Sequence, residues 1–115
     1  MPSIEMPPVS WEDVKRRVAQ RLMAANPQGT YDTPVEEPLY AIPVLQIELN
    51  GDGSIRRIDV PRRPSQGEET IALATEVLAH AAPFGDVSHL PKPWRFIETF
   101  LFNEDRKFKP RTLDE

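Results

Sequence analysis

Apolar residues recur at helical spacing near the start of the chain. At 100° per residue, one stripe carries Trp11, Val14, Val18, Leu22 and Ala25. Ser10 precedes this stripe with an N-cap hydroxyl, and acidic residues follow in the first turn, where the helix dipole favours them. Asn26 stands before Pro27 and is therefore pushed out of the helical region. The pattern predicts an amphipathic helix from Ser10 to about Asn26 whose stripe packs on a core.

A period of two replaces this pattern after a proline-rich crossing loop, residues 27–43. Leu45, Ile47 and Leu49 alternate with polar residues, which predicts a strand over residues 44–50 with one buried face.

A hairpin is predicted directly after this strand. The sequence Asn-Gly-Asp-Gly at residues 50–53 tolerates positive φ, which we expect at Gly53, and apolar residues follow at once. A bulge near Arg56 and Arg57 would return the apolar residues of the second strand to one face. These residues are Ile55, Ile58 and Val60.

A second helix and a third strand complete the pattern. Ser65-Gln66-Gly67-Glu68 fits a capping box, and Pro83 ends the helix. The apolar face of this helix carries Ile71, Ala74, Val77, Leu78 and Ala81. Residues 94–103 are rich in aromatic and β-branched residues and predict a strand that is apolar on both faces. One face carries Phe96, Phe100 and Phe102, and the other carries Ile97, Thr99 and Leu101.

These elements predict a two-layer α+β fold in the order α-β-β-α-β. A right-handed crossover through the second helix places the third strand beside the first. The result is a three-stranded antiparallel sheet of order 2-1-3 with the helices on one face. The 115 residues suffice for one domain, which we place at residues 10–104. Residues 1–9 are expected to form a disordered N-terminal tail, and residues 105–115 a loose C-terminal tail.

Composition and charge exclude several classes of function. The net charge of -4 gives no surplus of cations for a phosphate backbone, so no nucleic acid partner is expected. The chain has no cysteine, which excludes disulfide frameworks, thiolate zinc sites and thiol catalysis. The first ten residues hold no apolar run, so we expect neither a signal peptide nor a membrane span in this chain.

Two residue patterns that resemble metal or catalytic sites have simpler interpretations. Asn50, Asp52 and Ser54 have the spacing that opens a calcium loop, but the sixth position is Ile55 and the twelfth is Pro61. The two histidines, His80 and His89, lack a third ligand or a base and nucleophile at a supporting spacing. We therefore expect no catalytic residue, no metal site and no cofactor, and predict that the protein is not an enzyme.

An arginine cluster surrounds the second strand and could contact phosphates. It consists of Arg56, Arg57, Arg62 and Arg63, with Lys92 and Arg95 as further candidates. No stacking motif is interleaved with these cations, so the pattern favours a solvated strand whose charges protect a sheet edge.

Three segments together resemble a known family. They are residues 43–55, with the sequence PVLQIELNGDGSI, the alanine-rich helix that ends in Ala81-Ala82-Pro83-Phe84, and residues 94–102, with the sequence WRFIETFLF. This arrangement resembles the C-terminal domain of TonB and TolA proteins over roughly residues 43–103. The helix from Trp11 and the ending Phe108-Lys109-Pro110 are more similar to TolA. The Tyr-Pro pair and following Glu-Gly-x-Val strand start of many TonB domains are missing, as is the TolA cysteine pair, so the subfamily stays open.

The resemblance implies a periplasmic, non-enzymatic domain that is tethered through a linker to an inner-membrane helix. Such domains pass force or contact to partners at the outer membrane, with no catalysis and no cofactor. The expected partners are therefore proteins or extended peptides of the cell envelope, among them outer-membrane receptors. Two alternatives stay open at this point: a small α+β protein that binds nucleic acid through the arginines of the second strand, and a noncatalytic enzyme subunit.

The candidate binding site is the third strand, which the order 2-1-3 leaves at an edge of the sheet. An extended peptide can add to such an edge through main-chain hydrogen bonds, and the resembling family engages receptors in this way. The strand consists of Arg95, Phe96, Ile97, Glu98, Thr99, Phe100, Leu101 and Phe102. The three phenylalanines of this strand lie on the face that no predicted helix covers. We expect a partner strand, a second copy in a homodimer or the folded-back tail near Phe108 to cover them.

Overall fold

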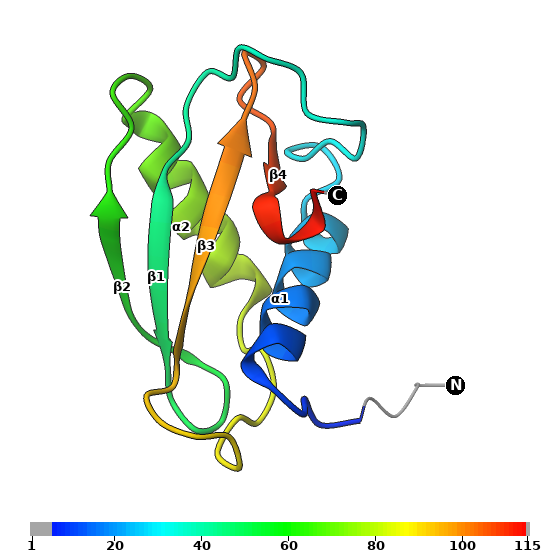
Figure 1. Ribbon diagram of the computed structural model, residues 1–115, viewed down its shortest axis with the longest axis vertical. Helices are drawn as coiled ribbons and strands as arrows, with labels where there is room; N and C mark the ends of the chain where they lie inside the picture. Colours follow the sequence, from blue (N-terminus) through cyan, green and yellow to red (C-terminus); the bar gives the residue numbers. More distant parts are fainter. Residues whose placement is uncertain (1–5, 115) are drawn as a thin grey trace.

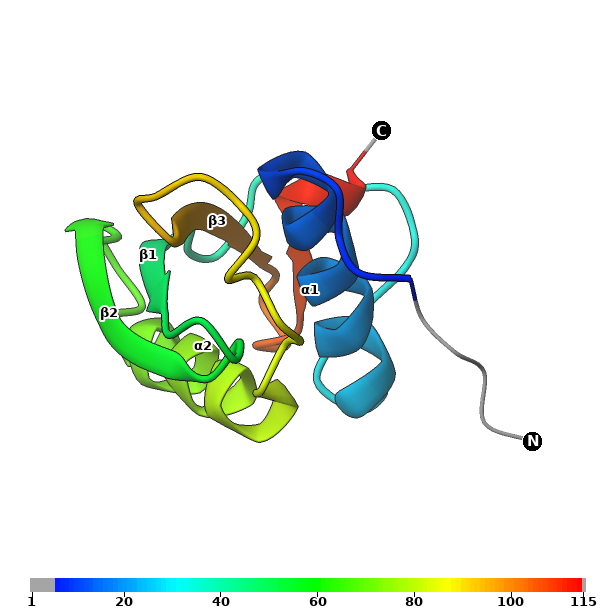
Figure 2. The ribbon, with the colours of Figure 1, turned by 90° about the horizontal axis from the view of Figure 1, so that it is seen from below.

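In a computed structural model of the chain, residues 6–114 are described, so residues 1–5 of the predicted N-terminal tail lie outside the described residues. The elements are α1 (Trp11–Ala25), β1 (Val44–Leu49), β2 (Ile55–Arg62), α2 (Glu69–Ala81), β3 (Arg95–Phe102), β4 (Phe108–Pro110) and the 3-10 turn η1 (Arg111–Leu113). All pairs in the sheet are antiparallel and the order is β2-β1-β3-β4. Both helices lie against one face of the sheet (Figure 1, Figure 2). The α+β class is confirmed. The sheet has four strands where three were predicted, because β4 was not foreseen.

Helix α1 forms as its sequence predicts. The Ser10 Oγ accepts a hydrogen bond of 3.1 Å from the Asp13 amide, which caps the helix. The stripe packs against the core through Val14, Val18 and Leu22. Ala25 was predicted to be buried with them but is exposed, and Ala19 is buried instead. Trp11 fixes the start of the helix, because its indole N–H donates to the Pro91 carbonyl at 3.0 Å.

The predicted capping box of α2 is wrong. Glu68 occupies the N-cap in a helical conformation and makes no capping hydrogen bond. The chain turns at Gly67, whose φ of 68° brings it so close to Tyr40 that a Cβ atom would lie 2.6 Å from the ring. This turn carries Glu68 outward to an ion pair with Arg63 at 2.6 Å, and the Thr70 hydroxyl donates to the Gly67 carbonyl instead.

The hairpin between β1 and β2 confirms the predicted turn. Gly53 has φ of 87°, and a Cβ atom there would lie 2.1 Å from the carbonyl oxygen of Gly85. The register between β1 and β2 shifts from one pair to the next: Glu48 pairs with Arg57, but Leu49 pairs with Ile55. Arg56 is left as the extra residue of the predicted bulge. Ile55 and Ile58 consequently both pack against the core.

The facing of β3 is the reverse of the prediction. Phe96 pairs with Ile47, and Glu98 with Leu45, so these β3 residues share the side of the sheet on which β1 is buried against the helices. Phe96, Phe100 and Phe102 therefore lie in the core, and Ile97 is left 44% exposed on the other face. A strand with two apolar faces has no alternation from which to choose its buried side.

The predicted loose C-terminal tail is also wrong. Phe108 is buried, and its ring centroid lies 5.1 Å from that of Phe100 and 5.4 Å from that of Phe102. Burial of this ring draws the chain back onto β3, where β4 and then η1 form. Of the three covers expected for the phenylalanines, the structure contains the folded-back tail.

Candidate protein-interaction site

Main-chain groups of β3 alternate between the two sides of the strand. The amides of Phe100 and Phe102 donate to Pro43 and Ala41 on the β1 side, at 3.0 Å each. The register with β1 continues this alternation, so amides of even-numbered residues point toward β1 and amides of odd-numbered residues point away from it. Leu101 accordingly pairs with Lys109 of β4 on the far side. The side away from β1 is called the outer side of β3 below.

The outer side of β3 is closed only at its C-terminal end. β4 pairs with Phe100, Leu101 and Phe102, and in Figure 1 it lies beside the end of β3. The prediction that β3 is an edge strand is therefore wrong for these residues, because the buried Phe108 holds β4 there. Residues 95–99 have no strand partner on the outer side among residues 6–114. We call this segment the open edge.

Three amides of the open edge point outward, those of Arg95, Ile97 and Thr99. The Arg95 amide donates to Pro93 at 3.1 Å, and the Thr99 amide donates to the carboxylate of the neighbouring Glu98 at 3.0 Å. The Ile97 amide, between them, has no hydrogen-bond partner within the described residues. The exposed Ile97 thus combines a free donor with an apolar side chain, as strand addition requires.

Glu98 is a carboxylate in the core-facing row of β3, with only 3% of its surface exposed. Burial raises its pKa, while hydrogen bonds from Thr112 and the Thr99 amide and the charge of Lys15 act in the opposite direction. Thr112 belongs to η1, which packs against both α1 and β3. Glu98 therefore lies on the strand against which the C-terminal segment after β4 packs.

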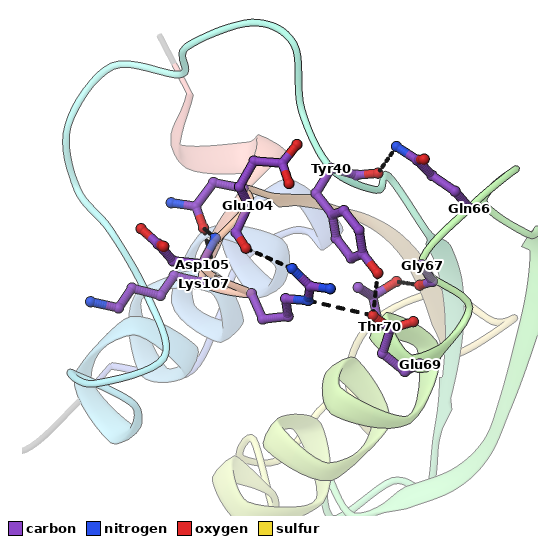
Figure 3. A network of polar contacts seen from close by, with 10 residues as sticks. Tyr40, Gln66, Gly67, Glu69, Thr70, Glu104, Asp105 and Lys107 are labelled. Carbon is purple, nitrogen blue, oxygen red and sulfur yellow. Dashed lines mark hydrogen bonds and ion pairs between the residues drawn. The ribbon is translucent and has the colours of Figure 1, made fainter.

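A polar network that the sequence did not reveal holds the turn between β3 and β4. Arg106 has a positive φ of 58°, its guanidinium lies 3.9 Å from the ring centroid of Tyr40, and its Nε lies 3.5 Å from Glu69. The Tyr40 hydroxyl donates to the same Glu69 carboxylate, and Gln66 donates to the Tyr40 carbonyl at 2.8 Å (Figure 3). The network fixes the turn that returns the chain to β3. No spacing in the sequence links its members.

The remaining candidates from the sequence lie apart from this site. His80 is exposed on α2, and His89 Nε2 lies 2.6 Å from the Pro8 carbonyl oxygen. Within residues 6–114 no three acidic or histidine side chains are grouped so that they could hold a metal ion.

Three arginines of the cluster around β2 are ion paired. Arg56 lies 3.9 Å from Glu48, Arg57 lies 3.0 Å from Asp59, and Arg63 contacts Glu68. These pairs reduce the positive potential that a phosphate backbone would meet. Lys92 lies 4.6 Å over the ring of Trp94.

Comparison of the chain with family models, with curated proteins and with solved structures gives no match. None of the helices among the described residues has the length and apolar character needed to cross a membrane.

Proposed function

We propose that the protein is a non-enzymatic protein-interaction domain that binds an extended partner segment by strand addition at the open edge of β3. The observation that carries this proposal is the unpaired outward amide of Ile97, beside an apolar side chain that is 44% exposed. A periplasmic location and an envelope protein as partner are part of the proposal, and they rest on the resemblance to the TonB and TolA C-terminal domains.

The other edge of the sheet is less suited to strand addition. β2 is irregular at two places in its register with β1, and Pro61 offers no amide. Arg56 and Arg57 project from it with 69% of each side chain exposed. Bulges, proline and charges are the features by which proteins protect an edge strand from pairing. Residues 95–99 carry no proline and no irregularity in their register with β1.

The decisive experiment replaces Ile97 by proline. Random decapeptides displayed on phage are selected on the full chain, and the affinity of a synthetic selected peptide is measured by calorimetry. Ile97→Pro removes the outward amide but no hydrogen bond to β1, because that amide points away from β1. We expect peptide affinity to fall about tenfold or more, while the fold is retained in circular dichroism.

Ile97→Thr is the matched control, since it keeps the amide and a β-branched side chain. We expect it to bind the peptide within a few-fold of the original chain. A substitution of Thr99 by proline is uninformative here, because the Thr99 amide is already taken by Glu98. Equal affinities of Ile97→Pro and the original chain, or peptide-induced amide shifts centred on β2, would refute strand addition at β3.

A further inference from the structure

Four cationic side chains lie along or beside the open edge. They are Lys15 of α1, Lys92 of the loop before β3, Arg95 of β3 and Arg111 of η1. We call them the edge cations. Within residues 6–114 none of them forms an ion pair with a carboxylate, whereas three of the four arginines around β2 are ion paired. Charges left unpaired in this way are available to a partner of opposite charge.

Contacts at both ends of the open edge fix where the edge cations stand. The Trp11 indole N–H donates to the Pro91 carbonyl at 3.0 Å, which holds the first turn of α1 near the start of β3. Lys15 follows Trp11 by four residues, so it lies on the same side of α1, about 6 Å further along the helix axis. The helix and the strand run in the same direction (Figure 1), so Lys15 stands alongside the open edge. At the other end, Arg111 directly follows the last residue of β4, which pairs with Phe100.

Few carboxylates offset the charge of the edge cations. Glu48, opposite Arg95 on β1, and Asp114 are each engaged by another cation, at 3.9 Å and 3.7 Å. Glu98 faces the core, where burial raises its pKa and so favours the uncharged form. Glu12, in the first turn of α1, forms no ion pair with the edge cations. The open edge is therefore positively charged, although the whole chain has a net charge of -4.

A second copy of the chain is poorly suited to this edge. Antiparallel pairing of two copies about Ile97 would bring the edge cations of both copies to one seam, and like charges across a strand pair are destabilising. β4 also limits the space: because it pairs with residues 100–102, an added strand has room only beside residues 95–99. Charged side chains of this kind keep an edge from pairing with itself and favour a strand of opposite charge.

We propose that the open edge selects an acidic extended segment, in which carboxylates on either side of an apolar residue meet the edge cations. This inference rests on the proposed function and names the chemistry of the partner. Successive side chains of an added strand point to opposite faces of the sheet. With an apolar residue beside Ile97, a carboxylate two residues away reaches Arg95 on the uncovered face. A carboxylate next to the apolar residue reaches Lys15 on the side of the helices.

The phage selection of decapeptides on the full chain tests this preference directly. We expect the selected peptides to be enriched in aspartate and glutamate relative to the unselected library. Replacing these acids in a synthetic selected peptide by asparagine and glutamine should weaken binding about tenfold in calorimetry. The acidic peptide should lose affinity by a similar factor on a chain that carries Lys15→Gln, Arg95→Gln and Arg111→Gln, with the fold retained in circular dichroism. Arg62→Gln removes an exposed cation of β2 that forms no ion pair within residues 6–114, and this matched control should leave the affinity unchanged.

The outcomes separate this inference from the proposed function. If the acidic peptide and its uncharged twin bind equally well, or the triple variant binds as tightly as the original chain, the acidic preference is wrong. Strand addition then still stands as long as Ile97→Pro weakens binding. If Ile97→Pro leaves binding intact, the proposed function fails, and the inference fails with it. A chain that elutes as a dimer in size-exclusion chromatography, and that the acidic peptide does not dissociate, would overturn the inference in favour of a second copy.

Discussion

At the residue scale, Arg106 shows a tertiary contact overriding a local preference of the backbone. Its φ of 58° lies in the left-handed region, which disfavours residues with a Cβ atom. The conformation places the guanidinium over Tyr40 and beside Glu69, so a cation–π contact and an ion pair offset the cost. Glu69 is exposed and Tyr40 is half-buried, so these contacts add little energy, and their main effect is to direct the turn so that Phe108 reaches the core.

Glu98 yields a prediction about pH. Because burial raises its pKa, the folded protein retains this proton at a pH where the unfolded chain has lost it. The resulting stabilisation is complete below the pKa of the unfolded carboxyl group and is lost as the pH rises through the raised folded pKa. Lys15, the charged group that faces Glu98 from α1, reduces this effect without reversing it. Glu98→Gln has no proton to lose.

The measurement is the free energy of unfolding in urea at a series of pH values. Relative to Glu98→Gln, we expect the original chain to lose stability as the pH rises above the ordinary glutamate pKa of about 4.3 and through the raised pKa of Glu98. Glu104→Gln, at an exposed position, is the control, and it should show no such trend. A difference that grows in the opposite direction would mean that Glu98 is stabilised as a carboxylate in the fold.

At the element scale, α1 is held by its apolar stripe more than by intrinsic helix propensity. Leu22 is fully buried, so Leu22→Ala should lower the free energy of unfolding by about 2–5 kcal/mol, measured by urea denaturation. Gln20→Ala, on the exposed side of the same helix, should change it by less than about 0.5 kcal/mol. If helix propensity, and not packing, set the stability of α1, neither variant would lose stability, because alanine has the highest helix propensity of all residues.

The elements that the sequence predicted are those with local signals. The Ser10 cap and the stripe define α1, and the turn at Gly53 with its bulge defines the hairpin, because residues near in sequence make these contacts. Tertiary contacts decided the rest. The capping box of α2 gave way to the contact between Gly67 and Tyr40. The three residues of β4 are too few for any periodicity to show.

The same distinction applies to the candidate site. The sequence indicated β3 as the strand, and the open edge retains Arg95, Ile97 and Thr99 from the predicted set. Which side of β3 faces the core depends on its register with β1, and how much of its outer side is free depends on β4. Neither pairing has a local signal. Glu98 was therefore counted among the binding residues although its carboxylate faces inward.

At the scale of the whole molecule, the crossing loop and the C-terminal segment meet around β4. The crossing loop covers the outer side of this strand, since the Phe108 amide donates to Gly29 at 3.0 Å and the Tyr31 amide donates to Phe108 at 3.2 Å. The Tyr31 hydroxyl donates to Leu101 of β3, and η1 packs on α1. The C-terminal end of this sheet edge, at Phe100 to Phe102, is thus covered by the chain itself, and the open edge is the part of β3 that β4 does not reach.

This closure predicts that the C-terminal segment belongs to the same cooperative unit as α1 and the sheet. Phe108→Ala removes a ring packed between two phenylalanines of β3 and should lower the free energy of unfolding of the whole chain by about 3–5 kcal/mol. Urea denaturation followed both by Trp11 and Trp94 fluorescence and by far-ultraviolet circular dichroism should show one coincident transition. The exposed Lys107→Ala, one residue earlier, serves as the control. If Phe108→Ala instead increases hydrogen exchange only in residues 104–114 and leaves the global transition unchanged, β4 is an appendage, and the open edge of β3 extends to Phe102.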